Sequence, residues 1–280
     1  YIILKLGRPG KISKIDVDTS HFNGNQPSMI SIEGTNSHSN KIKQFKWISI
    51  LSKKKVKANS HHFFSVKNNK IFTHIKFNIF PDGGVARLRL YGSIAKSKKM
   101  KNKKINLASL LDGASVIACN NEHFGKAENI LAPGKAKNMG DGWETARHKD
   151  RPAVLRAGPD GLLNNVTGSD WSAIALGMRG RILTLVVDTN HFKGNAPESV
   201  EVLAADTTTP KKLLDAGRRH KAWRTLLPRS KVIANTANKF GLEDRLKDVG
   251  DVTVLLLTIW PDGGVMRLRA LGAPSPASKI

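Results

Sequence analysis

The stretch Asp18–Pro27, with the sequence DTSHFNGNQP, returns later in the chain as DTNHFKGNAP at Asp188–Pro197. Seven of the ten positions are identical. A second pair of stretches, PDGGVARLR at Pro81–Arg89 and PDGGVMRLR at Pro261–Arg269, follows in the same order. Self-similarity that keeps its order while its offset drifts slowly indicates one domain written twice, with loop insertions between the copies.

The repeat sets the domain limits that we expect. The first copy spans residues 1–92, a basic linker spans 93–105, the second copy spans 106–272 and a tail spans 273–280. Trp171 aligns with Tyr1, so the stretch before Trp171 has no counterpart in the first copy. We therefore expect the first copy to be incomplete, truncated at its N-terminus.

Within each copy the apolar residues follow the spacing of strands. Lys11–Val17 and Arg181–Val187 are short β-branched runs, and Val252–Trp260 is an apolar run stopped by a Pro-Asp-Gly-Gly turn. Pro fixes φ at one turn position and Gly permits positive φ at the next, after which a new strand begins. Short strands at this spacing predict an all-β fold with two tandem homologous jelly-roll β-sandwich domains. Helix is expected to be minor, at Ile105–Leu111.

Composition narrows the class of protein. No apolar run approaches the roughly 18 residues that a membrane helix needs, and no charged-then-apolar leader opens the chain. The single cysteine, Cys119, cannot form an internal disulfide, which suits a reducing compartment. The last three residues, Ser278-Lys279-Ile280, resemble a peroxisomal signal with Ile in place of the usual Leu. We expect a cytoplasmic protein without membrane contact, and a peroxisomal location stays open.

The net charge of +24 is distributed unevenly. Residues 1–105 hold 22 Lys and Arg against 4 Asp and Glu, whereas residues 106–280 hold 24 against 18. Most of the excess lies in polar lysine runs that lack the interleaved aromatic or Arg contacts of nucleic-acid sites. We interpret these runs as a solvated face and a linker, so nucleic acid is an unfavoured partner.

Each Asp-Thr-x-His-Phe box follows directly on a strand, so its polar side chains emerge at a strand end, where binding groups usually sit. His191 is a candidate general base, acid or metal ligand, with Asp188 to orient it and Asn195 nearby; His21 is its counterpart in the first copy. The alternative is a structural turn, in which Asp188 and Asn195 satisfy loop amides and His191 packs under Phe192.

Arginines alternate along the strand after each Pro-Asp-Gly-Gly turn. Arg267 and Arg269 share one face beside the turn that carries Asp262. A guanidinium pair can bind both oxygens of a small carboxylate, although alternating arginines on an exposed strand are equally ordinary. The first copy repeats the set as Asp82, Arg87 and Arg89.

A third stretch, Lys137–Arg147 (KNMGDGWETAR), is dense in turn residues and charges. It can place Asp141, Glu144 and Arg147 around a polar ligand, or it can be a Gly-rich turn anchored by a buried Trp143. The sequence contains no phosphate-binding Gly-rich loop, His-Glu-x-x-His motif, cysteine pair or nucleophile elbow that would compete with these boxes.

Together the boxes resemble the allantoicase family (allantoate amidinohydrolases). The matching stretches are Asn138–Thr145, Ser169–Trp171, Val187–Asn195 and Pro261–Arg269. The resemblance covers nearly the whole chain and implies two jelly-roll domains of the galactose-binding-like type. It also implies hydrolysis of allantoate to ureidoglycolate and urea in purine degradation, with allantoate as the small-molecule substrate and a homo-oligomer as the assembly.

The reaction implied by the resemblance needs a carboxylate-binding group, an acid and a base. Arg267 or Arg269 would hold the substrate carboxylate. His191 with Glu144 or Asp188 would protonate the leaving urea nitrogen and activate water. A divalent metal ion on His and carboxylates stays open, because no diagnostic ligand spacing is present, and no cofactor is assigned with certainty.

The chain also departs from the family pattern. Asn120–Gly125 stands where the family usually reads Ser-Asp-Glu-His-Phe-Gly, so a carboxylate is lost at Asn121. The alternative functions are a non-catalytic jelly-roll binding module or an inactive allantoicase-like protein, since fold alone does not give function. A nucleic-acid-binding role ranks third.

Overall fold

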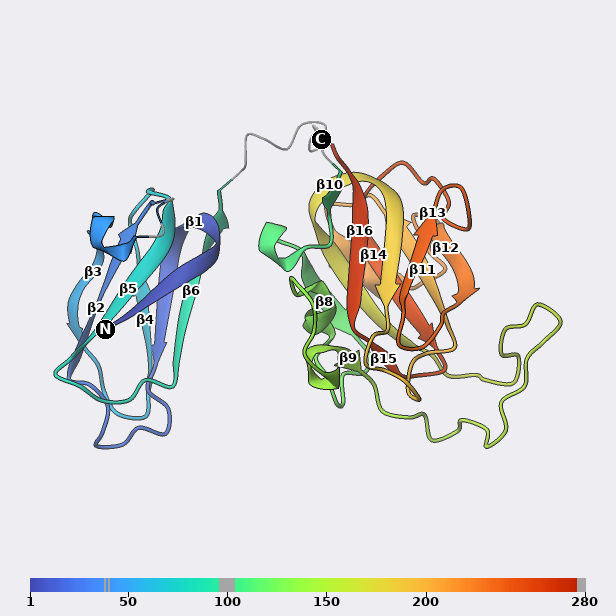
Figure 1. The fold of residues 1–280 in the computed structure, drawn as a ribbon, viewed down its shortest axis with the longest axis horizontal. Helices are drawn as coiled ribbons and strands as arrows, with labels where there is room; N and C mark the ends of the chain where they lie inside the picture. Colours follow the sequence, from blue (N-terminus) through green and yellow to red (C-terminus); the bar gives the residue numbers. More distant parts are fainter. Residues whose placement is uncertain (38, 40, 96–103, 276–280) are drawn as a thin grey trace. The chain divides into compact units, whose positions relative to one another are not determined.

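The computed structural model describes residues 1–37, 39, 41–95 and 104–275 (Figure 1). The chain divides into two compact units, Tyr1–Ser97 and Lys98–Ile280. Each unit is a β-sandwich of the jelly-roll type, and helix is minor in both.

The described residues of the first unit form six strands. They are β1 Ile2–Asp18, β2 Met29–Thr35, β3 Ile48–Lys55, β4 His61–Ser65, β5 Phe72–Phe80 and β6 Arg87–Ile94, with a 3-10 turn η1 at Ile42–Gln44. The order of hydrogen-bonded neighbours is β3-β2-β5-β1-β4, and β6 also pairs with β1. All of these pairs are antiparallel.

The second unit repeats this arrangement and adds to it. Its strands are β7 Ile105–Asn106, β8 Ser115–Cys119, β9 Trp143–Glu144, β10 Asp170–Asp188, β11 Ser199–Ala205, β12 Arg224–Lys231, β13 Ala237–Gly241, β14 Asp251–Trp260, β15 Gly264–Val265 and β16 Arg267–Pro274. Its helical turns are η2 Leu110–Asp112, η3 Ala127–Leu131, η4 Met139–Asp141 and α1 Pro210–Asp215. The order β12-β11-β14-β10-β16 reproduces the first unit, with β13 and β8 also paired to β10.

One long strand in each unit joins the two layers of the sandwich. In β1, Ile2–Lys5 pair with β5, and after a register shift Lys14–Asp18 pair with β4. In β10, Asp170–Ala175 pair with β14, and Thr184–Asp188 pair with β13. The predicted runs at 11–17 and 181–187 are therefore the second halves of longer strands, each of which ends at the aspartate of its box.

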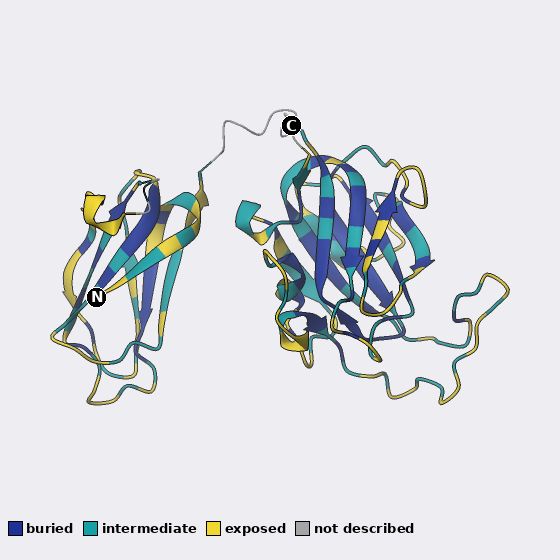
Figure 2. Ribbon diagram, viewed as in Figure 1, coloured by how far each residue is buried: buried dark blue, intermediate teal, exposed yellow. Residues whose placement is uncertain are grey.

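Each sandwich closes around its own apolar core (Figure 2). Ile15, Val17 and Ile75 are fully buried in the first unit, as are Val187 and Leu255 in the second. Burying one such aliphatic side chain contributes about 1.5–3 kcal/mol, so the inward-facing residues of the long strands hold the two layers together.

Some predicted boundaries and elements differ from the structure. The stretch 105–111 forms a two-residue strand and then enters a 3-10 turn, and the α-helix lies at Pro210–Asp215, where Pro occupies the first turn and Leu213 is buried. Strand β6 extends to Ile94 and strand β16 to Pro274, each two residues beyond the predicted repeat ends. No helix in the described part of the chain has the length and apolarity that crossing a membrane requires.

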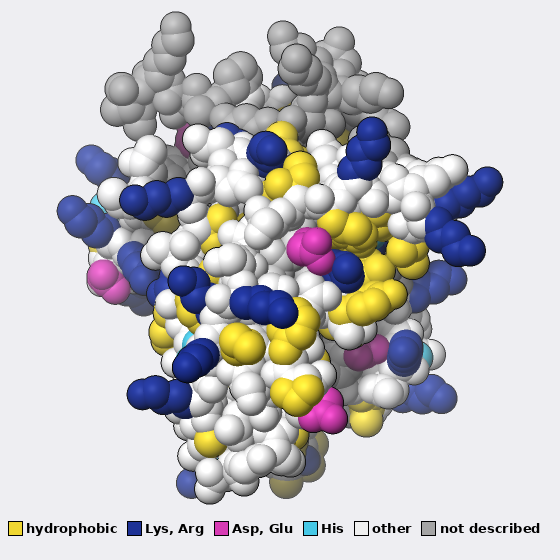
Figure 3. Space-filling view, turned by 90° about the vertical axis from the view of Figure 1, so that its left-hand side faces the viewer, with side chains coloured by type: hydrophobic (Ala, Val, Ile, Leu, Met, Phe, Trp, Pro, Cys, Tyr) yellow, Lys and Arg dark blue, Asp and Glu magenta, His cyan; other side chains and the backbone are white. Residues whose placement is uncertain are grey.

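The charge excess of the sequence is visible on the surface. Figure 3 shows Lys and Arg side chains spread over the face in view, with hydrophobic patches between them and few Asp or Glu. They do not gather into a single stripe in this view. Most of the predicted basic linker at 93–105 lies outside the described residues.

Candidate active site

The box at Asp188–Pro197 forms a tight turn at the end of β10. His191 has φ of 69°, and its backbone N–H donates to Asn235 Oδ1 at 2.8 Å. The Thr189 hydroxyl donates to the carbonyl of Ile233 at 2.7 Å. These bonds fix the backbone of the turn while the His191 side chain remains exposed.

Phe192 holds the turn against two other segments. Its ring is fully buried, and it lies so close to Gly142 and Gly264 that no side chain fits there. A Cβ added at Gly264 would be 2.1 Å from the ring, and one added at Gly142 would be 2.8 Å away. Glycine at both positions therefore brings the 138–144 stretch and the Pro-Asp-Gly-Gly turn onto one aromatic ring.

Glu144 is positioned by the short strand β9, which pairs with β15 through Glu144 and Gly264. The Asn195 side-chain amide donates to Glu144 Oε1 at 2.6 Å, and the Gly264 N–H donates to the Asn195 carbonyl at 2.8 Å. Glu144 Oε2 has no hydrogen-bond partner among the described residues, and the residue is half-buried. Glu144 and Asn195, which were predicted from different boxes, are thus in direct contact.

A pocket of about 590 Å³ lies beside this contact. Its lining residues are Asn138, Met139, His191, Lys193, Gly194 and Asn195. Two of the predicted site residues, His191 and Asn195, line the pocket. A third, Glu144, lies beside it through its hydrogen bond with Asn195. Three of the other lining residues, Asn138, Met139 and Lys193, were not predicted, although all stand inside the boxes.

Asp188 does not orient His191. Its Oδ1 accepts from the Asn190 backbone N–H at 2.8 Å and from the Asn190 side chain at 2.6 Å. The structural interpretation of the turn is therefore right for Asp188. It is wrong for His191, because that side chain is exposed and only Phe192 is buried.

Arg267 and Arg269 bind main-chain carbonyls. Arg267, only 5% exposed, donates from Nη1 to the Asp141 carbonyl at 2.6 Å. Arg269 donates from Nη2 to the Ala132 carbonyl at 2.7 Å. Burial, and then the neighbouring charge of Arg267, lowers the pKa of Arg269. Both guanidiniums clamp the 130–141 stretch onto β16, while Arg267 Nε is buried without a hydrogen-bond partner. Their predicted role in carboxylate binding stays a prediction.

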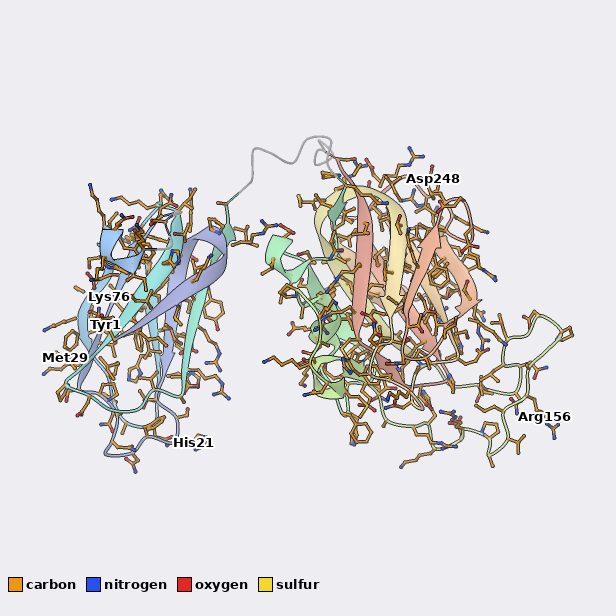
Figure 4. The ribbon with its side chains drawn as sticks, in the orientation of Figure 1. Tyr1, His21, Met29, Lys76, Arg156 and Asp248 are labelled. Carbon is orange, nitrogen blue, oxygen red and sulfur yellow. The ribbon has the colours of Figure 1, made fainter. Side chains whose placement is uncertain are left out.

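Asp262 and Arg147 also lie apart from the pocket lining. Asp262 is 5% exposed, accepts from Arg151 Nη1 at 2.5 Å and takes the His148 backbone N–H at 3.0 Å. Arg147 is exposed. Asp262 therefore anchors the start of the long stretch between β9 and β10, which Figure 1 shows extending away from the sandwich and on which Figure 4 labels Arg156.

A polar network that sequence reasoning missed supports this anchor. The fully buried Asp170 accepts from Asn120 Nδ2 at 2.9 Å and from Asn121 Nδ2 at 3.4 Å, and His148 Nε2 lies 3.4 Å from its Oδ2. The Ser169–Trp171 box, to which no role was assigned, contains this aspartate. Asn121 donates to a buried carboxylate at the position where the resemblance led us to expect a carboxylate.

One known protein family matches both units of this chain. The family described as Allantoicase repeat matches residues 1–95 and 105–275. The chain belongs to the allantoicase family.

Individual relatives are similar in sequence to this chain over nearly its full length. A probable allantoicase of Pseudomonas fluorescens (strain SBW25) is 39% identical over 278 residues, covering 98% of this chain and 78% of that protein. A probable allantoicase of Rhizobium meliloti (strain 1021) is 40% identical, covering 97% and 76%. A crystal structure of allantoicase from Saccharomyces cerevisiae is 31% identical with a TM-score of 0.73, covering 96% of this chain and 76% of that chain.

The first allantoicase repeat has the same turn. His21 has φ of 68°, and its N–H donates to Asn59 Oδ1 at 2.9 Å; Figure 4 labels it at the loop end of the unit. Asp82 and Arg87 are exposed. In the second repeat the stretch with Glu144 precedes Trp171, the residue that aligns with Tyr1.

Arg89 contacts carboxylates rather than carbonyls. Its Nη1 donates to Asp16 Oδ2 at 2.9 Å and to Asp18 Oδ2 at 3.4 Å, and His61 Nδ1 lies 3.1 Å from Asp16 Oδ1. The hydrogen bonds from Ser20, followed by the charge of His61 and a hydrogen bond from Arg89, lower the pKa of Asp18 to about 2. This cluster occupies the two carboxylates within the first unit.

A metal site is not apparent in the described residues. Across residues 1–37, 39, 41–95 and 104–275, no three His, Cys, Asp or Glu side chains are grouped to hold a metal ion.

Proposed function

We propose that the pocket of the second unit is where this allantoicase-family chain hydrolyses allantoate to ureidoglycolate and urea. The observation that carries the proposal is the 2.6 Å contact between Asn195 and Glu144, beside the exposed His191. It supports a site with an oriented carboxylate and an imidazole, the two types of group that general acid and base catalysis uses most often.

Glu144 has the features of the base. Asn195 holds one of its carboxylate oxygens, while the second has no partner among the described residues and can accept a proton from water. The water oxygen then bonds to the central carbon of allantoate as the bond from that carbon to one ureido nitrogen breaks. The carboxylate is half-buried, which strengthens its interaction with a reacting water relative to bulk solvent.

His191 has the features of the acid. Its backbone is fixed by Asn235, so the ring projects from a rigid turn into the same pocket. The imidazolium gives its proton to the departing nitrogen, which leaves as urea. Solvent returns the proton from Glu144 to His191, so one water is consumed for each urea released.

The substitution Glu144→Gln tests the proposal. It keeps the shape and removes the base, so we expect urea release from allantoate to fall roughly 100- to 10,000-fold. Glu128→Gln is the matched control, because Glu128 is an exposed carboxylate of the same unit outside the pocket. Urea release by Glu144→Gln at the rate of the control would overturn the proposal. A wild-type chain that binds allantoate and releases no urea would favour the binding-module alternative.

The assembly is a further part of the proposal. We infer that the chain forms a homo-oligomer, because Phe63 and Tyr91 on the strands of the first unit are 56% and 46% exposed, and aromatic side chains are enriched at protein interfaces. Sedimentation equilibrium gives the mass in solution. A monomer at micromolar concentration would contradict this part.

Location also remains a proposal. The tripeptide Ser278-Lys279-Ile280 lies outside the described residues. Its lack of the usual Leu makes the cytoplasm the favoured location. A fluorescent protein carrying these three residues at its C-terminus should stay diffuse in a eukaryotic cell, and punctate peroxisomal signal would reverse the assignment.

A further inference from the structure

The proposed site leaves the negative charge of the substrate without the predicted partners. Arg267 and Arg269 donate to main-chain carbonyls, and Arg151 is paired with Asp262. Arg267 Nε and Arg151 Nε are buried without a hydrogen-bond partner, but none of the three arginines lines the pocket. An allantoate carboxylate inside the pocket therefore needs a different cation.

Lys193 is the cation that lines the pocket. It is exposed and stands between His191 and Asn195 in the turn. Among the described residues, no carboxylate forms an ion pair with it. The turn around it is fixed, since the buried Phe192 precedes it and Asn195 is bonded on both its side chain and its carbonyl. An unpaired ammonium on a rigid turn is thus available to a ligand.

We propose that Lys193 binds the carboxylate of the substrate and selects ureides that carry a carboxylate on the reacting carbon. This inference rests on the proposed function, because it uses the same pocket. With the carboxylate on Lys193, a ureido group extends toward the side of the pocket where Asn195 holds Glu144. The ammonium and carboxylate at two sides of the pocket then fix which bond faces the acid and the base.

The first unit differs from the second at the position of Lys193, where it has Asn23. Its turn otherwise keeps the histidine, the glycine and the second asparagine of the box. The charge that would anchor the substrate is therefore present in the second repeat and replaced by a neutral amide in the first.

Lys193→Met tests the inference because it keeps the length of the side chain and removes the charge. We expect KM for allantoate to rise roughly ten- to a hundredfold, the size of one hydrogen bond to a charged group, with kcat changed by less than about threefold. Lys193→Arg should restore KM to within about fivefold of the wild type. Lys239→Met is the matched control, since Lys239 is an exposed lysine on β13.

A second measurement reports on the carboxylate itself. The wild-type chain should prefer allantoate over its primary amide, and Lys193→Met should lose most of that preference. A purely structural effect of the substitution would raise KM for allantoate and for the amide by the same factor.

The outcomes separate this inference from the function on which it rests. If Glu144→Gln abolishes urea release while Lys193→Met matches Lys239→Met in KM and in acid-over-amide preference, the role of Lys193 is overturned and the site stands. A fall in kcat with KM unchanged overturns it as well. Full activity of Glu144→Gln would remove the site, and the role of Lys193 with it.

Discussion

The two repeats place the same turn in different surroundings. His21 and His191 have φ values of 68° and 69°, and both donate their N–H to the side chain of an asparagine. Phe22 and Phe192 both lie against the second glycine of a Pro-Asp-Gly-Gly turn. In the second repeat the 138–144 stretch also packs on Phe192 and brings Glu144 to Asn195.

This comparison separates scaffold from chemistry. The shared residues of the box fix the same backbone in both units. Lys193 and Asn23 occupy equivalent positions and differ in charge, so the repeated motif by itself accounts for a repeated turn, and the cation beside it belongs to the second unit.

Truncating the buried ring should have the largest effect. Phe192→Ala is expected to destabilise the second unit by about 3–5 kcal/mol, because a fully buried aromatic side chain leaves a cavity. Phe22→Ala should cost less, since its ring is only partly buried. Hydrogen exchange of peptides from each unit in the full chain measures both. Equal losses of stability in the two units would contradict the assignment of Phe192 as the residue that packs its own turn against the 138–144 stretch and the Pro-Asp-Gly-Gly turn.

Removing the imidazole should separate the two repeats by activity. His191→Asn is expected to lower kcat for urea release by about 100-fold, because the acid is lost while Asn tolerates the positive φ. His21→Asn preserves the same backbone and should leave kcat unchanged. If His21→Asn lowered kcat as much as His191→Asn, the first repeat would have to contribute to the site.

Replacing the clamp arginine should have a more modest effect. Arg269→Met leaves the carbonyls of Ile130 and Ala132 without this donor, and we expect about 1–3 kcal/mol of local destabilisation. Faster hydrogen exchange in residues 127–135 reports it. Arg89→Met is the comparison, because Arg89 holds Asp16 and Asp18 and no covering stretch. Unchanged exchange in Arg269→Met would argue against the clamp.

The smallest expected effect depends on pH. The pKa of Asp18 is lowered from 3.8 to about 2 in the folded unit, so its carboxylate stabilises folding above about pH 4. That contribution declines as the pH falls from about 4 to about 2. In Asp18→Asn, the unfolding midpoint of the first unit should change less over this range, as measured by urea titration at each pH. An unaltered pH dependence would remove Asp18 as the cause.

Much of the fold could be predicted because its signals are local. The β-branched run at 11–17, the apolar run at 252–260 and the Pro-Asp-Gly-Gly turns all form the predicted elements. The length of β1 and β10 could not be predicted, because each strand changes partners at a register shift that apolar alternation does not mark.

The candidate site was predictable in its residues and not in their contacts. Glu144, Asn195 and His191 were identified from their types and their positions at strand ends. The distant partners of Arg267 and Arg269 are main-chain carbonyls more than 120 residues away, and a carbonyl carries no residue type to be recognised. Lys193 was not predicted as a site residue. In the sequence, a single lysine in a turn cannot be distinguished from a solvated surface charge, because its spatial neighbours are not known.

The packing around the buried ring of Phe192 links local unfolding of the second unit to loss of the contact between Glu144 and Asn195. Glycines from two distant stretches touch it, and the carboxylate and the amide of the pocket belong to the segments that it joins. An opening of the sandwich that wets this ring also pulls Glu144 away from Asn195. Catalytic competence should therefore vanish at the onset of local opening, well before the rest of the unit unfolds, which would make urea release an early sensor of partial denaturation.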